Sequence, residues 1–248
     1  MKKIVGVIPC HLNSIRLKRK VLLDLYGLPM LEHVRRRALK SKKLKEIYIA
    51  TGDKEIIEIM KKFLSNILYS KKKHKNGTTR VAEGLEKINC SHVILIQGDE
   101  PLLKPEYIDT IYQCIEKDKK SNIDSWNLTA PLKPKEIFIN SVVKCDTKNN
   151  YINSLFRRRN DYNKNLRKIL GIIAYKKEVL TQIVEIKPSN LEKNLKIEQL
   201  RILENNFNLK SIKVRKSLQS INIYSDISKV KYQLINNKYQ NKIYKSLY

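Results

Sequence analysis

The first half of the chain contains several short apolar runs, each of which stops abruptly. Ile4 to Ile8 is a continuous apolar run that ends at Pro9, and Ile47 to Ala50 is a second. His92 to Ile96 is a third, and it leads directly into the polar turn Gln97–Pro101. Short continuous apolar runs are typical of strands that are buried on both faces of a parallel sheet.

Segments with helical spacing of apolar residues separate these runs. They predict helices over Pro29–Leu39, from a cap at Asp53 to Lys62, over Val81–Ile88 and over Pro105–Ile115. Alternation of strand and helix favours an α/β fold with a doubly wound, mostly parallel, Rossmann-like sheet. Ligands bind such sheets at the carboxyl edge of the strands, which is where the turn after His92–Ile96 would lie.

The second half has a different pattern, with more strands and fewer helices. We find no internal repeat and no flexible linker, so we predict a single domain over 1–248 with a smaller substrate-side subdomain at about 126–215, which also carries the dimerisation elements. A helix is predicted over Leu191–Leu203 and a closing helix from Asp226. The predicted strands are Trp126–Pro131, Val142–Cys145, Ile169–Tyr175, Ser211–Val214 and Ile221–Tyr224.

Composition agrees with a globular protein of one large domain. Of 248 residues, 42% are hydrophobic and 30% are charged. The net charge of +27 indicates attraction to phosphates in general. The lysines are scattered along the whole chain, and aromatic residues do not interleave with a basic stripe, so we predict no specific nucleic-acid binding.

Cysteines and apolar segments indicate the compartment. Cys10, Cys90, Cys114 and Cys145 are far apart and form no CxxC pair, which favours reduced thiols in a cytoplasmic protein. The first residues resemble the start of a signal peptide, but Pro9 cuts the apolar run short. No stretch approaches the roughly 20 apolar residues of a membrane span.

Three polar segments at predicted strand ends carry candidate chemistry. The loop after the first strand is rich in hydroxyl and cationic groups, which suit a phosphate cradle or simply a solvated basic loop. It lacks the glycines of a Walker loop. The turn Asn76–Arg80 can bind an anion or a base edge, or can be an ordinary helix cap. Asp99 and Glu100 are adjacent, so in extended chain they would face opposite sides and serve different tasks.

Taken together, these pieces resemble the 3-deoxy-manno-octulosonate cytidylyltransferase family, the enzymes that make CMP-Kdo for lipopolysaccharide. The resemblance covers almost the whole chain, and its eight motifs are specific as an ordered set. In chain order they are Ile8-Pro9, Ser14-x-Arg16-Leu17, Lys20, Gly27-x-Pro29-Met30, Ala50-Thr51, Gly77-Thr78-x-Arg80-x-Ala82-Glu83, Gln97-Gly98-Asp99-Glu100-Pro101-Leu102 and Glu198-Gln199-Leu200-Arg201.

The resemblance implies transfer of CMP from CTP to a Kdo-like sugar acid, with Mg²⁺ as cofactor and a homodimeric assembly. It implies that Asp99 and Asn222 hold the metal, and that Lys20, Arg16 and Asp99 are the catalytic residues. The implied nucleotide-binding residues are Pro9, His11, Ser14, Arg16, Lys20, Thr78, Arg80 and Gln97, with Thr78 and Arg80 near the cytosine. Arg158, Glu198 and Gln199 match positions near the sugar acid, although Arg158 also fits a solvated face of the basic run 157–159.

Several positions depart from the family pattern. His11 stands where the family has arginine, Lys18-Arg19 replaces Pro-Gly, and Thr79 replaces an acid. Ile169 and Ile173 fall where a substrate-facing histidine and tyrosine are expected, and Asn222 falls where a second metal-binding aspartate is expected.

An amide oxygen ligates Mg²⁺ but brings no charge, so the departure at Asn222 should lower metal affinity. Three interpretations therefore stay open at this point. The protein is a weakened CMP-Kdo synthetase, it activates a different acidic sugar, or it is a nucleotide-binding protein without activity.

Overall fold

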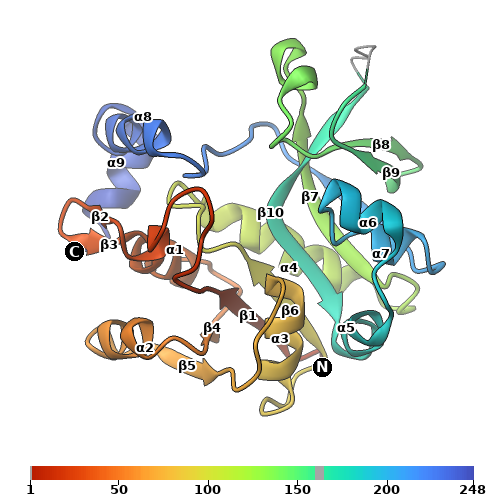
Figure 1. Ribbon diagram of the computed structural model, residues 1–248, viewed down its shortest axis with the longest axis horizontal. Helices are drawn as coiled ribbons and strands as arrows, with labels where there is room; N and C mark the ends of the chain where they lie inside the picture. Colours follow the sequence, from red (N-terminus) through yellow and green to blue (C-terminus); the bar gives the residue numbers. More distant parts are fainter. Residues whose placement is uncertain (1, 160–164) are drawn as a thin grey trace.

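The computed structural model describes residues 2–159 and 165–248. Within them, nine strands form one sheet in the order β5-β4-β1-β6-β10-β7-β11-β9-β8 (Figure 1). The strands are β1 (Ile4–Pro9), β4 (Ile47–Thr51), β5 (Asn66–Tyr69), β6 (His92–Ile96), β7 (Ser125–Pro131), β8 (Lys144–Lys148), β9 (Tyr151–Phe156), β10 (Arg167–Lys176) and β11 (Leu209–Lys213). A separate two-stranded ribbon pairs β2 (Asp24–Leu25) with β3 (Leu28–Pro29).

Most strands of the large sheet run in one direction. Strands β5, β4, β1 and β6 are parallel neighbours, and β7 is parallel to β11. Strand β10 lies between β6 and β7 and is antiparallel to both, and β9 is antiparallel to β11 and β8. The predicted α/β fold with a mostly parallel sheet is therefore confirmed, with β10 as an antiparallel insertion.

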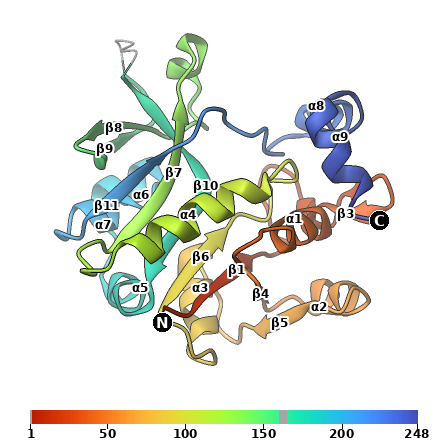
Figure 2. The same cartoon turned by 180° about the vertical axis from the view of Figure 1, so that it is seen from behind.

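Helices cover both faces of the sheet. The residues of β1 form an unbroken apolar run because both faces of the strand are buried. Ile4 and Ile8 pack into one core cluster, whereas Val5 and Val7 pack into the other. Helices α1, α2, α4 and α8 contribute to the first cluster, and α3, α5 and α7 contribute to the second. Figure 2 shows α1 and α4 in front of the sheet, and Figure 1 shows α3 and α5 in front of the opposite face.

The α-helices differ in length, from four residues in the shortest to thirteen in the longest of the described residues. None of those in the described residues is long and apolar enough to cross a membrane. The α-helices are α1 (Met30–Leu39), α2 (Lys54–Lys61), α3 (Gly77–Leu85), α4 (Pro105–Lys117), α5 (Lys177–Glu185), α6 (Asn190–Leu195), α7 (Leu200–Leu203), α8 (Tyr224–Asn236) and α9 (Lys238–Lys245). Two short 3₁₀ helices, η1 (Lys20–Leu22) and η2 (Pro134–Phe138), lie in loops.

Three local predictions need correction. The predicted strand Ile221–Tyr224 is wrong, because α8 begins at Tyr224 and the preceding residues join no sheet. The predicted helix Leu191–Leu203 is two short helices, since Lys196 is left-handed (φ 52°) and ends α6. Asp53 precedes α2 as predicted but does not cap it, because its carboxylate accepts the Leu12 N–H (3.0 Å) instead.

Candidate active site

Two adjoining hollows lie at the carboxyl ends of β1 and β6. The larger, called here the large cleft, has a volume of about 720 Å³, and the smaller, called the small pocket, about 110 Å³. Gln97 and Asp99 line both, so the hollows meet at the turn after β6. This is the edge at which the parallel strands β1, β4 and β6 end, as expected for a ligand site in an open α/β sheet.

The loop after β1 forms one wall of the small pocket. Its backbone is fixed where Leu12 accepts the Arg19 N–H (2.9 Å) and donates to Asp53. The Arg19 guanidinium pairs with Glu55 of α2, so the charge of Arg19 is compensated away from the pocket. The residues that line the small pocket are Pro9, Cys10, His11, Ser14, Lys20, Val21, Gly77, Arg80, Gln97, Gly98 and Asp99.

Two cation contacts connect this loop to the opposite side of the site. The Lys20 Nζ lies 2.6 Å from the Asp99 Oδ2, with only 16% and 22% of the two side chains exposed. The Arg16 Nη2 donates to the Asn222 Oδ1 over 3.1 Å. Because the Ile221 N–H donates to the Asp99 carbonyl (3.1 Å), Asn222 and Asp99 stand on adjoining segments. Three segments that are far apart in sequence therefore meet at one place, the loop with Arg16 and Lys20, the turn with Asp99 and the segment with Asn222.

Asp99 and Glu100 face different partners. Glu100 is buried, and its Oε1 accepts a hydrogen bond from the Ser220 hydroxyl (3.1 Å). Burial, and then the negative charge of Asp99, raise the pKa of Glu100 to about 7. Asp99 instead pairs with Lys20. The close approach of β10 to the turn after β6 depends on Gly171, because a Cβ added there would lie 2.9 Å from both the Gln97 side chain and the Glu100 Oε1.

Helix α3 brings its first turn to the site. The Thr78 hydroxyl donates to Glu198, which lies between α6 and α7, and burial raises the pKa of Glu198 despite this bond. Both residues line the large cleft, and Arg80, which is 8% exposed, lines the small pocket. The break between α6 and α7 is what lets Glu198 turn toward α3.

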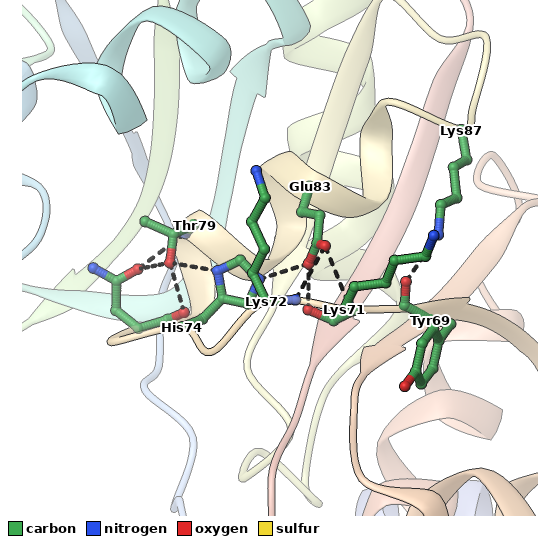
Figure 3. Close-up of polar contacts among 9 residues, drawn as sticks. Tyr69, Lys71, Lys72, His74, Thr79, Glu83 and Lys87 are labelled. Atoms are coloured by element: carbon green, nitrogen blue, oxygen red, sulfur yellow. Dashed lines mark hydrogen bonds and ion pairs between the residues drawn. The ribbon is translucent and has the colours of Figure 1, made fainter.

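The loop before α3 is tied to that helix by a buried carboxylate (Figure 3). Glu83 accepts hydrogen bonds from the Ser70 hydroxyl (2.5 Å), the backbone amides of Lys71 (3.0 Å) and Lys72 (3.3 Å), and the His74 Nε2 (2.7 Å). Burial alone would raise the pKa of Glu83, but these hydrogen bonds lower it to about 2. Glu83 is therefore ionised throughout the neutral range and fixes the loop.

His74 carries this connection on to the first turn of α3. Its Nδ1 lies 3.1 Å from the Thr79 Oγ1, and the Thr79 N–H donates to the Asn76 cap (2.9 Å). Thr79, which stands where the resemblance expects an acid, is thus part of the support beneath Thr78 and Arg80 rather than a lining residue of either hollow.

Replacing Glu83 by glutamine should destabilise the protein by about 2 to 3 kcal/mol near neutral pH, because a pKa lowered from 4.5 to about 2 stabilises the ionised fold. A lowered acid pKa stabilises the fold above the unfolded value and loses its effect as pH falls through the folded value. The difference from wild type should therefore shrink between pH 4.5 and about 2. Urea unfolding of both proteins across this range tests it, and a difference that does not change with pH would contradict it.

A divalent metal would find few protein ligands here. Within residues 2–159 and 165–248 no group of three or more His, Cys, Asp or Glu side chains is arranged to hold one. Asp99 and Asn222 nevertheless provide a carboxylate and an amide oxygen on adjoining segments. This oxygen set fits Mg²⁺, which is often held by one or two protein ligands together with substrate phosphates and water.

The hollows bring together all but one of the residues predicted from sequence. Arg158 is exposed and is not among the residues that line either hollow. Ile169 and Ile173 line the large cleft on its apolar side, with Ile197. The large cleft contains Arg16, Thr78, Gln97, Asp99, Glu198, Gln199 and Asn222, and the small pocket contains Pro9, His11, Ser14, Lys20, Arg80, Gln97 and Asp99.

Sequence reasoning missed an ion pair in the large cleft. Lys168 of β10 donates to Glu136 of η2, with 9% and 15% of the two side chains exposed. Burial alone would raise the pKa of Glu136, but the hydrogen bonds that it accepts from the Lys168 side chain and the Lys133 amide lower it. No local pattern connects these residues, since only the return of β10 past η2 brings them together.

Comparison with known proteins gives one consistent match. A sequence model of the cytidylyltransferase family matches residues 5–244. The 3-deoxy-manno-octulosonate cytidylyltransferase of Chlorobium phaeobacteroides is 30% identical over 95% of this chain and 98% of its own length. The protein of the same name from Escherichia coli is 29% identical over 93% of this chain and 96% of its own.

Solved structures agree. CMP:2-keto-3-deoxy-manno-octonic acid synthetase, in complex with CTP, superposes with a TM-score of 0.87 at 27% identity, and covers 95% of this chain and 99% of that one. The 4-diphosphocytidyl-2C-methyl-D-erythritol synthase of Anaerococcus prevotii superposes with a TM-score of 0.62 over 94% of this chain and 98% of that one. At 18% identity, the second likeness concerns the fold alone.

Proposed function

The chain belongs to the cytidylyltransferase family and to its 3-deoxy-manno-octulosonate cytidylyltransferases, and from this premise we propose that it transfers CMP from CTP to Kdo or a closely related 3-deoxy sugar acid, releasing pyrophosphate. One observation carries the proposal. Lys20 and Arg16 of a single loop face Asp99 and Asn222 where the small pocket meets the large cleft. Cations and metal-ligand oxygens gathered at one point suit an attack on a phosphate.

The nucleotide would occupy the small pocket, with its phosphates directed toward Asp99. Ser14, Arg16 and Lys20 would hold the triphosphate, because the two cations offset the charge that develops as pyrophosphate leaves and the hydroxyl can donate a hydrogen bond to it. Arg80, which lines the small pocket, and Thr78, which lines the adjoining large cleft, would lie near the cytosine, on the turn of α3 that the Glu83 network supports.

Mg²⁺ is the cofactor we propose, held by Asp99 and Asn222 together with the phosphates. When bound, it would polarise the α-phosphate and offset its charge. The residues of the chain would position the reacting groups for in-line attack, which contributes through orientation.

The sugar acid would occupy the large cleft, beside Glu198 and Gln199. Its carboxylate needs a cation, and the cations that line the cleft, among them Lys168, are better placed for that role than the exposed Arg158. Ile169 and Ile173 would contact carbon atoms of the sugar, since they offer no hydrogen bond.

We further propose a homodimer that acts in the cytoplasm in lipopolysaccharide synthesis. The dimeric assembly follows the family resemblance, and free Cys10, Cys90, Cys114 and Cys145 suit a reducing compartment. Light scattering of the purified protein would measure the mass of the assembly directly.

Pyrophosphate release from CTP, with purified protein, Mg²⁺ and Kdo, tests the proposed reaction. We expect turnover with Kdo and CTP, and little with UTP or ATP. Other ulosonic acids in place of Kdo would define the sugar. No turnover with any of these acids, from protein that binds CTP, would reject the enzymatic proposal.

A further inference from the structure

Each of the two candidate metal-ligand oxygens is already hydrogen-bonded to a cation. The Lys20 ammonium lies 2.6 Å from the Asp99 Oδ2, and the Arg16 guanidinium donates to the Asn222 Oδ1 over 3.1 Å. We propose that Lys20 and Arg16 hinder the binding of divalent cations to Asp99 and Asn222. When a nucleotide binds, its phosphates would attract the Lys20 and Arg16 side chains away from these two ligands. The inference rests on the proposed function, because it uses the phosphate-binding roles of Lys20 and Arg16.

The two pairs act together because each side of the contact is one structural unit. Lys20 and Arg16 belong to the same loop, whose backbone is held by Asp53 at Leu12. The two oxygens belong to segments joined by the bond from the Ile221 N–H to the Asp99 carbonyl. The loop therefore contacts one oxygen of each ligand, and a triphosphate that engages the loop would release both contacts.

The Lys20 contact with Asp99 would hinder metal binding through electrostatic repulsion. A dication at Asp99 would stand within a few ångströms of the Lys20 ammonium, and like charges at this distance repel strongly where little solvent screens them. The lining of the large cleft has no excess of acids that would offset this repulsion. Besides Arg16 it contains five lysines, and besides Asp99 it contains four acids, Glu100, Glu136, Glu198 and Asp226. Glu136 is paired with Lys168, and Asp226 lies 3.7 Å from Lys229.

As a consequence, metal binding and nucleotide binding should be thermodynamically linked. Phosphates supply negative charge that attracts Lys20, Arg16 and the metal together, so each ligand should strengthen binding of the other, by the same factor in both directions. A site built from several carboxylates would instead bind the metal first. The described residues contain no such cluster, which agrees with a metal that binds weakly in the absence of nucleotide.

Replacing Lys20 by methionine separates these effects. In the full-length protein without nucleotide, Mn²⁺ binding measured by electron paramagnetic resonance should tighten about tenfold, because the repelling charge is gone. In the same variant without metal, CTP binding measured by calorimetry should weaken about tenfold or more. Opposite changes from one substitution cannot come from partial unfolding, which would weaken both.

Two further variants define the outcomes. Lys43→Met removes a lysine from an exposed ion pair with Glu116 and should change neither affinity. Adding Asp99→Asn to Lys20→Met should abolish the gain in Mn²⁺ affinity, and a gain that persists would place the metal elsewhere and overturn the inference. Weaker CTP binding with no gain in Mn²⁺ affinity would also overturn it while leaving the proposed function intact. Unchanged CTP binding would instead reject the phosphate-binding role of Lys20.

Discussion

Asparagine in place of Asp99 is expected to lower kcat/KM for pyrophosphate release about 1,000-fold, which is the scale of losing a main electrostatic contact in a transition state. Asp99 lines both hollows and pairs directly with Lys20. Its amide counterpart keeps the shape and one oxygen but loses the charge that would hold a metal beside the phosphates. A coupled assay for pyrophosphate, with saturating CTP and a sub-saturating series of the Kdo-like acid, measures the loss.

The control for this substitution is Glu46→Gln, which changes a half-exposed carboxylate whose partners are Lys3 and Tyr48, remote from the site. It should leave kcat/KM within about twofold of wild type, as surface changes usually do. Thermal unfolding should show that Asp99→Asn stays folded, because Asp99 is partly exposed and its loss opens no cavity. A folded Asp99→Asn protein that loses less than about tenfold would contradict the assignment of Asp99 to the reacting phosphate.

The parallel half of the sheet could be predicted because its strands carry their own signal. Val5 and Val7 face one core and Ile4 and Ile8 the other, so β1 has to be apolar at successive positions. The place of β10 could not be predicted in the same way. An apolar run does not encode strand direction, and β10 is antiparallel to both β6 and β7.

In the candidate site, too, some residues could be placed from local sequence and others could not. The loop that carries Arg16 and Lys20 and the turn that carries Asp99 could be placed from sequence, because they come after β1 and β6, whose carboxyl ends meet at one edge. The roles of these three residues came from the family resemblance. Asn222 entered through the family resemblance, while the local pattern around it wrongly predicted a strand. Contacts between remote segments, such as Lys168 with Glu136, leave no trace in local composition.

Restoring a carboxylate at position 222 is the second large change we expect. Asn222→Asp should raise kcat/KM about tenfold when Mg²⁺ is limiting, because a charged oxygen binds a hard cation more tightly than an amide oxygen does. The gain should fall as Mg²⁺ approaches saturation. Titration of Mg²⁺ at fixed CTP and sugar acid, for wild type and variant in parallel, measures both features.

The neighbours of Asn222 determine where this gain appears. Arg16 donates to the Asn222 Oδ1 at 3.1 Å, and a carboxylate there would hold Arg16 more strongly and oppose its movement to the phosphates. The Asn222 N–H is bonded to Asp226, so the new charge also stands near an existing one. We therefore expect the benefit in the Mg²⁺ requirement rather than in kcat at saturation. Asn222→Ala, which removes the oxygen altogether, should raise the Mg²⁺ requirement. If neither the aspartate variant nor the alanine variant changed the Mg²⁺ requirement, Asn222 would not be a metal ligand, and the interpretation of this chain as a CMP-Kdo synthetase weakened at its metal site would be wrong.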